Sequence, residues 1–272
     1  MLKKYLKLCF FTIIYIIPIY IKLKKFNIKK IIFFNFLNWH NGYCYFRGIY
    51  LGKEVFIKID TKLHLLVNDK LAYDLCKDIM QDDLVDILHH SLDGKIQFVV
   101  YEFLNSNELD ENILLNNMKY LDDIIRILNN LSKLGIIHRD IKLDNFLVSN
   151  NKLKIIDFTF SNSNTHQDFK DLDVNNSNNC FILEALGHGL NPAPFVWDDY
   201  YSFYTILKKL DEDVSADRKV KLNTYKKEID KFVGKTVYRV KYDAKYYLFI
   251  RNIKIVIKDV LRIDHNYRSL HE

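Results

Sequence analysis

The chain has 272 residues, of which 49% are hydrophobic and 27% are charged. These proportions are ordinary for a globular protein, and they exclude a disordered chain, a collagen and a small disulfide-stapled scaffold. The net charge of +6 is small for this length and gives no indication of a nucleic-acid partner. The four cysteines form no CxxC pair, so we expect buried thiols in a reducing compartment and no zinc site.

The N-terminal segment, residues 1–30, holds eight lysines and no acidic residue. Within it, residues 8–21 (LCFFTIIYIIPIYI) are uncharged, but this stretch is shorter than the roughly 20 residues that cross a bilayer. No small-residue cleavage pattern follows, so we do not expect a secretory signal. We expect a basic, apolar anchor on the cytoplasmic face of an anionic membrane. The alternative is a β-rich segment packed on the domain, since Ile, Tyr and Phe also favour strands.

The part of the chain that follows reads as β-rich. Residues 43–50 and 54–59 have the pattern of two strands joined by a tight turn at Leu51-Gly52-Lys53. Residues 69–80 have a helical pattern, and residues 96–103 (IQFVVYEF) form an apolar run suited to a buried strand.

The polar stretch 105–112 marks a boundary, after which the chain becomes more helical. Apolar residues recur at helical spacing over 119–134, and Gly135 stands where a helix end favours a residue that tolerates positive φ. From Asp211 a charged helical stretch precedes β-branched and aromatic runs, to which we assign no chemistry. The sequence contains no internal repeat.

Residues 137–158 (IHRDIKLDNFLVSNNKLKIIDF) carry the most informative spacing. Lys142 and Asn145 lie two and five residues after Asp140, and Asp157 follows Asn145 by twelve. Phosphoryl transfer from ATP requires a carboxylate to accept the proton of the attacking hydroxyl, a cation near the moving phosphate, and oxygen ligands for Mg²⁺. We therefore predict Asp140 as the base, Lys142 at the γ-phosphate, and Asn145 with Asp157 as the metal ligands.

This segment resembles the catalytic loop and metal-binding strand of the eukaryotic-type protein kinase family, and Lys142 is typical of its serine/threonine branch. The resemblance implies an α+β, two-lobed fold with a β-rich N-lobe over 31–104 and a mainly helical C-lobe over 105–272. ATP and Mg²⁺ would bind between the lobes. It also implies that Asp199 steadies the catalytic loop from a helix of the C-lobe.

The resemblance extends to the N-terminal side. Val55-Phe56-Ile57-Lys58 is similar to the VAIK strand of the family, in which the lysine contacts the α- and β-phosphates. Tyr101 falls at the gatekeeper position, and Glu102 and Phe103 fall in the hinge that reads the adenine edge. By the same resemblance Leu147 contributes to the nucleotide site.

Four positions depart from the family pattern. Gly42 alone remains near the glycine-rich loop, and Phe56 replaces the small alanine above the adenine, where its ring either fills the pocket or shifts the nucleotide. The partner of Lys58 is Asp69 or Asp74, each one methylene shorter than the usual glutamate; Asp74 fits the spacing better, and Asp69 has Tyr73 one turn later. Thr159 replaces the glycine of the DFG turn.

Three functional hypotheses remain open. The acceptor is a serine or threonine hydroxyl of a protein, which the HRDIK motif favours, or a sugar of a cell-envelope glycolipid, which the basic, apolar N-terminus favours. The third hypothesis is a pseudokinase that binds nucleotide or partners without transfer. Ser161, Ser163, Thr165 and Ser177 lie in the expected activation segment and are candidates for phosphorylation, with Arg139 as the partner of the phosphate; the alternative is that they are solvated loop residues.

Overall fold

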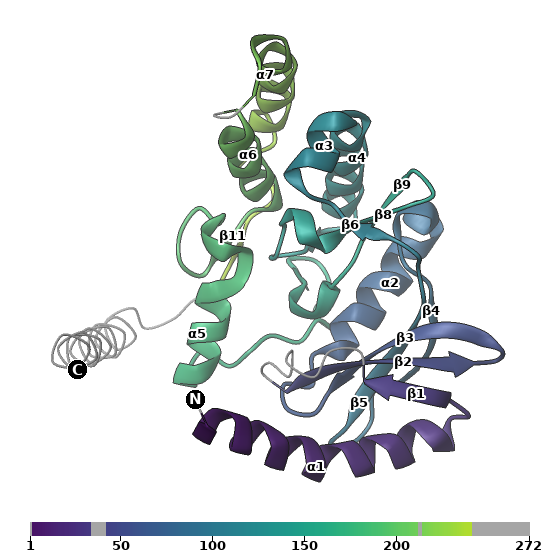
Figure 1. Ribbon diagram of the computed structural model, residues 1–272. Helices are drawn as coiled ribbons and strands as arrows, with labels where there is room; N and C mark the ends of the chain where they lie inside the picture. Colours follow the sequence, from purple (N-terminus) through teal and green to yellow (C-terminus); the bar gives the residue numbers. More distant parts are fainter. Residues whose placement is uncertain (1, 34–41, 212–213, 241–272) are drawn as a thin grey trace, which may run out of the picture.

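The computed structural model describes residues 2–33, 42–211 and 214–240 (Figure 1). Its N-terminal half is built around one antiparallel sheet of five strands in the order β1-β2-β3-β5-β4. The strands are β1 (Lys29–Phe33), β2 (Tyr43–Tyr50), β3 (Lys53–Asp60), β4 (Ile87–Ser91) and β5 (Gln97–Glu102). Helix α2 (Leu66–Met80) and the short 3₁₀ turn η2 (Gln81–Asp83) connect β3 to β4. We call this sheet, with α1 and α2, the N-lobe.

The β2–β3 hairpin forms because two residues supply its tight turn. Leu51 and Gly52 both have positive φ, 50° and 81°, and Tyr50 pairs with Lys53 across the turn. Two central residues with positive φ match the right-handed twist of the flanking strands. The strands expected over 43–50 and 54–59 are therefore confirmed, as are the helix over 69–80 and the strand within 96–103.

The N-terminal segment is a helix, α1 (Leu2–Lys25), so the expectation of a β-rich segment is wrong in its secondary structure. Ile19 and Leu23 are buried and share a core cluster with Val55 and Ile57 of β3. Their spacing of four residues places them on one face of the helix. Figure 1 shows α1 lying along one side of the sheet, with α2 on the other. Helix α1 thus closes the N-lobe core.

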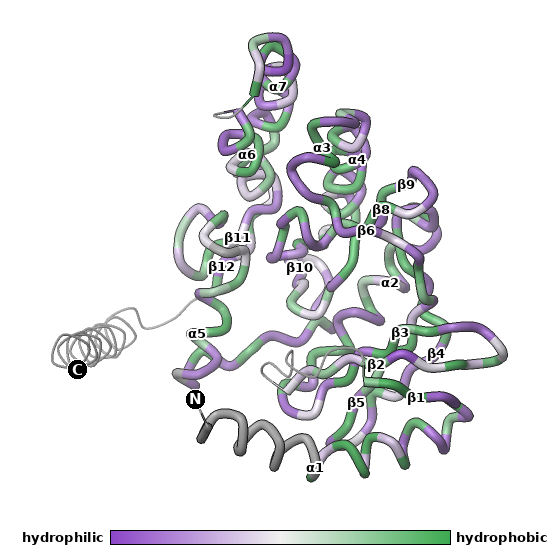
Figure 2. The backbone as a smooth tube through the Cα atoms, viewed as in Figure 1, coloured by the Kyte–Doolittle hydropathy of each residue, from purple (hydrophilic) through white to green (hydrophobic). Residues whose placement is uncertain are grey.

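Over residues 14–25 of α1 the opposite face is exposed, and this part of the helix becomes hydrophilic toward its C-terminal end (Figure 2). Lys22 Nζ donates to the carbonyl oxygens of Asp93 and Ile96, which ties the end of α1 to the turn between β4 and β5. Among the described residues, no helix has both the length and the apolarity needed to span a bilayer.

The elements after β5 are mainly helical, and we call them the C-lobe. Its helices are α3 (Glu111–Asn116), α4 (Lys119–Lys133), α5 (Ser177–Ala185), α6 (Asp199–Leu210) and α7 (Ala216–Asp230). Its short strands are β6 (Asn107–Glu108), β7 (Ile136–Ile137), β8 (Phe146–Ser149), β9 (Lys152–Ile155), β10 (Asn162–Ser163), β11 (Val196–Trp197) and β12 (Tyr238–Arg239). Three 3₁₀ turns complete it: η3 (Leu143–Asn145), η4 (Phe158–Phe160) and η5 (Leu186–Gly189).

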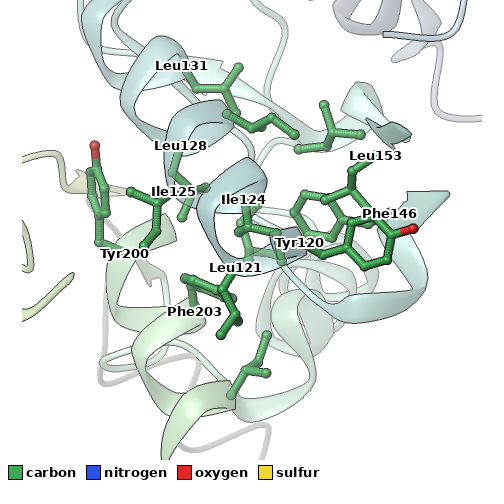
Figure 3. Close-up of a cluster of buried hydrophobic side chains, with 14 of the residues drawn as sticks. Tyr120, Leu121, Ile124, Ile125, Leu128, Leu131, Phe146, Leu153, Tyr200 and Phe203 are labelled. Atoms are coloured by element: carbon green, nitrogen blue, oxygen red, sulfur yellow. The ribbon is translucent and has the colours of Figure 1, made fainter. Parts of the chain in front are cut away.

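Helix α4 is the centre of the C-lobe core. Its apolar face packs against Phe146 and Leu153 of the β8–β9 hairpin and against Phe203 of α6 (Figure 3). The helix ends where expected, and Gly135 follows it with φ of 67°. A sheet-based N-lobe and a helical C-lobe confirm the expected mixed α and β fold. The aromatic runs after residue 240, and residues 34–41 just before Gly42, lie outside the described residues.

We expect Leu128→Ala to lower the free energy of unfolding by about 2–5 kcal/mol, because Leu128 is 1% exposed in the middle of α4 and its truncation leaves a cavity. Urea unfolding followed by circular dichroism measures the change. Val220→Ala on α7 is the matched control, since Val220 is 70% exposed and its truncation should change stability by no more than about 0.5 kcal/mol. Equal effects of the two substitutions would contradict this description of the core.

Candidate active site

A cleft of about 580 Å³ lies between the two lobes. Its walls come from β2, β3 and α2 on one side and from the segments around η3 and Asp157 on the other. Seven of the eight predicted site residues line it: Lys58, Glu102, Phe103, Lys142, Asn145, Leu147 and Asp157. The eighth, Asp140, contacts two of these seven directly. The structure therefore brings the whole predicted set together.

Asp140 accepts three hydrogen bonds. Its Oδ2 accepts from Asn145 Nδ2 at 2.9 Å and lies 3.1 Å from Lys142 Nζ, while its Oδ1 accepts from the Gly187 amide at 2.8 Å. Asn145 Nδ2 also donates to the Asp140 carbonyl oxygen at 2.7 Å, which fixes the turn between them. Asp140 is 7% exposed. Gly187 was not expected at the site, because nothing in its local sequence indicates a contact 47 residues away.

Asp199, at the start of α6, holds the backbone of the catalytic loop. Its carboxylate accepts from the amides of His138 at 2.7 Å and Arg139 at 3.0 Å, which is the steadying role expected for it. Arg139 has φ of 70°, in the left-handed region, and such a conformation costs about 1–3 kcal/mol and persists only where the surroundings impose it. Burial raises the pKa of Asp199, and the two backbone donors and His138 partly offset that rise.

Lys58 is the cation of a buried polar cluster. Its Nζ donates to Asp157 Oδ1 at 2.7 Å, to Asp69 Oδ2 at 3.1 Å and to the Thr159 hydroxyl. Burial alone would lower the pKa of Lys58, but the two carboxylates outweigh it and raise that pKa well above its usual value. Burial pushes the pKa of Asp157 upward, and the Lys58 ammonium reverses this and holds it well below its usual range. Both groups are charged at neutral pH.

The partner of Lys58 on α2 is Asp69. Asp74 instead forms ion pairs with Lys70 and Lys77 on the same helix, the second at 3.4 Å. The better fit of Asp74 to the family spacing is therefore not reflected in the contacts.

Thr159, which replaces the glycine of the DFG turn, is part of the same cluster. Its hydroxyl donates to Asp69 Oδ2 at 2.6 Å and accepts from Lys58. Asn68, next to Asp69, donates to the Thr159 carbonyl oxygen at 2.9 Å. From the sequence, Thr159 was only a departure from the family pattern. In the structure its hydroxyl bridges Lys58 and Asp69, and the Asp69 side chain is one methylene shorter than the usual glutamate.

The prediction that Asn145 and Asp157 are the metal ligands agrees with the side-chain oxygens that these two residues have left to offer. Asn145 uses its amide nitrogen for Asp140, which leaves its amide oxygen, and Asp157 uses Oδ1 for Lys58, which leaves Oδ2. Mg²⁺ in proteins is usually held by one or two such oxygens together with water and substrate phosphates. Within the described part of the chain, no cluster of three His, Cys, Asp or Glu side chains forms a metal cage. The donor set fits a Mg²⁺ ion that arrives with a nucleotide.

Aromatic rings form the N-lobe wall of the cleft. The Phe56 ring stacks on Tyr45 of β2, with centroids 5.6 Å apart and planes at 21°, and lies 6.4 Å from the Tyr101 ring. Phe56 leaves the cleft open, so the alternative in which its ring fills the pocket is not what the structure shows. The sequence analysis did not identify Tyr45 as a site residue, although Tyr45 pairs directly with Lys58 in the β2–β3 register.

Comparison with known proteins agrees with this geometry. Residues 72–178 match the family model described as protein kinase domain. The chain is 34% identical over 118 residues to a probable serine/threonine-protein kinase of Encephalitozoon cuniculi, which covers 41% of this chain and 21% of that protein. It is 32% identical over 118 residues to a cell cycle protein kinase of Candida albicans, which covers 40% of this chain and 16% of that protein.

A serine/threonine-protein kinase of Aspergillus fumigatus is 30% identical over 115 residues, which covers 40% of this chain and 14% of that protein. The similarity thus spans about a fifth or less of the length of each of these relatives. The lobes, the cleft and these matches together show that residues 72–178 are similar to the eukaryotic-type protein kinase domain.

Proposed function

We propose that the protein transfers the γ-phosphate of ATP to a serine or threonine hydroxyl of another protein. One observation carries the proposal: Lys142 and Asn145 both contact the carboxylate of Asp140, within the cleft where Lys58 pairs with Asp157. A carboxylate, two cations and two free ligand oxygens at one place are the groups that phosphoryl transfer requires.

In this proposal the nucleotide lies in the cleft with its base toward β5 and its phosphates toward Lys58. Leu147 of β8 lines the C-lobe side of the base. The amides of Glu102 and Phe103 donate to the carbonyl oxygens of Asp86 and Glu54, at 2.9 and 3.4 Å. We therefore assign the hinge amide that reads the base to Leu104, the next residue that lines the cleft, while the expected hinge residues Glu102 and Phe103 line the cleft beside it.

The chemical step follows from the position of Asp140. The acceptor hydroxyl attacks the γ-phosphorus, its proton passes to the Asp140 carboxylate, and the bond from the γ-phosphorus to the bridging oxygen breaks to release ADP. Lys142 stabilises the charge on the transferring group, and Lys58 holds the α- and β-phosphates. Mg²⁺, held by Asn145 and Asp157, would neutralise charge on the phosphate oxygens.

We expect Asp140→Asn to lower the rate of transfer by about 10²–10⁴-fold, the usual contribution of a positioned general base, while MgATP affinity changes little. The assay uses the purified chain, γ-labelled ATP, Mg²⁺, and cytosolic and membrane extracts of the source cell. Asp168→Asn is the matched control, because Asp168 is exposed in the segment after the site and should leave transfer unchanged. Asp157→Ala should weaken Mg²⁺-dependent nucleotide binding as well as transfer.

The fate of the label separates the hypotheses. Label in protein supports the proposal, and label in a lipid extract supports the glycolipid kinase. Folded protein that binds MgATP without any transfer supports the pseudokinase. Transfer by Asp140→Asn at the wild-type rate would refute the assignment of the base.

We also propose that α1 rests on the cytoplasmic face of an anionic membrane. Ile14, Ile17 and Ile21 are 48%, 60% and 52% exposed, and their spacing places them on one face of the helix, away from the buried Ile19 and Leu23. Exposed lysines at 24, 25, 29 and 30 follow this face. An apolar helix face bordered by lysines matches an anionic lipid surface.

Co-sedimentation with vesicles tests this second proposal. The protein should pellet with vesicles that contain phosphatidylserine and much less with phosphatidylcholine alone, and the double substitution Ile17→Glu and Ile21→Glu should abolish pelleting. Ile79→Glu on α2, where Ile79 is 58% exposed, is the control and should pellet like the wild type. Pelleting that is unaffected by the α1 substitutions would rule this surface out.

A further inference from the structure

The guanidinium of Arg139, next to Asp140, is buried in an aromatic sandwich. Its side chain is 1% exposed, and its central carbon lies 4.0 Å from the centre of the Trp197 ring and 5.0 Å from that of the Tyr238 ring. Cation–π contacts of this kind are favourable, but they do not replace a counter-charge for a cation removed from water.

Asp171 supplies that counter-charge. Its Oδ1 accepts from Arg139 Nη1 at 2.9 Å, and its Oδ2 accepts from the Tyr238 hydroxyl at 3.0 Å. One carboxylate therefore joins the catalytic loop to β12 and to the segment that follows η4. The partners are 32 and 67 residues distant in sequence, so this contact is a property of the tertiary fold.

The residue before Asp171 is fixed from the N-lobe. Asn68 of α2 accepts from the Lys170 amide and donates to the Lys170 carbonyl oxygen, both at 2.8 Å. Asn68 is completely buried. The pair Lys170-Asp171 is thus held on one side by α2 and on the other by the catalytic loop, and the same stretch of chain leads on to Gly187, whose amide contacts Asp140.

Two of the hydroxyl groups proposed above as phosphorylation sites, those of Ser161 and Ser163, are poorly placed for that role, whereas Thr165 is exposed. Ser161 is fully buried, and Ser163 is 8% exposed, with its hydroxyl donating to the Gly135 carbonyl oxygen at 2.6 Å. Arg139, expected as the partner of an added phosphate, is already paired with Asp171. The expectation that Arg139 is available to a phosphate is therefore wrong for this conformation.

Kinase activation segments are commonly ordered by phosphorylation, through new pairs between arginine and the phosphate. We propose that Asp171 is a positioning residue that performs this task with a permanent carboxylate, so that residues 158–190 are held for catalysis without phosphorylation. This inference rests on the proposed kinase function. Its consequence is that the enzyme is active as synthesised, before any phosphorylation of residues 158–190.

The first test removes phosphate from the full chain with a phosphatase, confirms its absence over residues 158–190 by mass spectrometry, and measures transfer. Full activity is expected. Loss of activity that returns on rephosphorylation of this segment would overturn the proposal.

The second test compares Asp171→Asn with Asp171→Glu. Asp171→Asn should lower kcat by about 10- to 100-fold, the range produced when a catalytic group is slightly misplaced, and should raise KM for the acceptor while leaving KM for ATP unchanged. Asp171→Glu, which keeps the charge, should recover most of kcat. Asp173→Asn is the matched control. The Asp173 carboxylate accepts hydrogen bonds from the backbone amide and the side-chain amide of Asn175, which lies in the same turn. Equal kinetics for Asp171→Asn and Asp173→Asn would refute the role of Asp171.

Hydrogen exchange separates a failure of this inference from a failure of the proposed function. If the wild type transfers no phosphate, the kinase assignment fails, but the effect of Asp171 on the segment is still measurable. Asp171→Asn should then accelerate amide exchange across residues 158–190, and Asp173→Asn should accelerate it only around its own turn. Unchanged exchange in Asp171→Asn would overturn the inference whatever the activity.

Discussion

The structure depends on the pairing of one buried cation, Lys58, with two carboxylates. The three partners come from separate elements: Lys58 from β3, Asp69 from α2, and Asp157 from the turn between β9 and η4. A buried ammonium is costly unless its counter-charges are close, so this pairing constrains where α2 and that turn can lie against the sheet. The cleft exists between these elements because the same three side chains hold them at a fixed separation.

The same principle organises the catalytic loop. Asp199 binds two of its backbone amides from α6, and Asp171 neutralises the Arg139 guanidinium from the segment after η4. Each contact joins residues far apart in sequence, and together they fix the two residues that precede Asp140. Asp140 itself receives donors from its own loop and from Gly187. Carboxylates from distant parts of the C-lobe thus converge on a single loop, which carries the groups proposed for catalysis.

The sequence predicted what is local and left open what depends on packing. The spacing of Asp140, Lys142 and Asn145 identified a site because these residues share one short loop. The choice between Asp69 and Asp74 required the rotation of α2 against the sheet, which periodicity does not determine. The composition of residues 8–21 favours helix and strand alike. The helical form is the one in which α1 packs its apolar residues against the sheet, a tertiary contact that the composition does not show. Arg139 and Asp171 meet across 32 residues, a contact without any local signal.

The most direct test is a double-mutant cycle between Lys58 and Asp69, measured as the affinity for MgATP by calorimetry. Lys58→Met and Asp69→Ala should each weaken binding, and the double variant should lose less than their sum, because both substitutions break the same pair. We expect a coupling free energy of about 0.5–3 kcal/mol, the range found for residues in contact. Asp74→Ala, five residues further along α2, should bind like the wild type and show no coupling to Lys58. Additive losses for Lys58 and Asp69, or coupling of Lys58 to Asp74 instead, would contradict the arrangement on which the site is built.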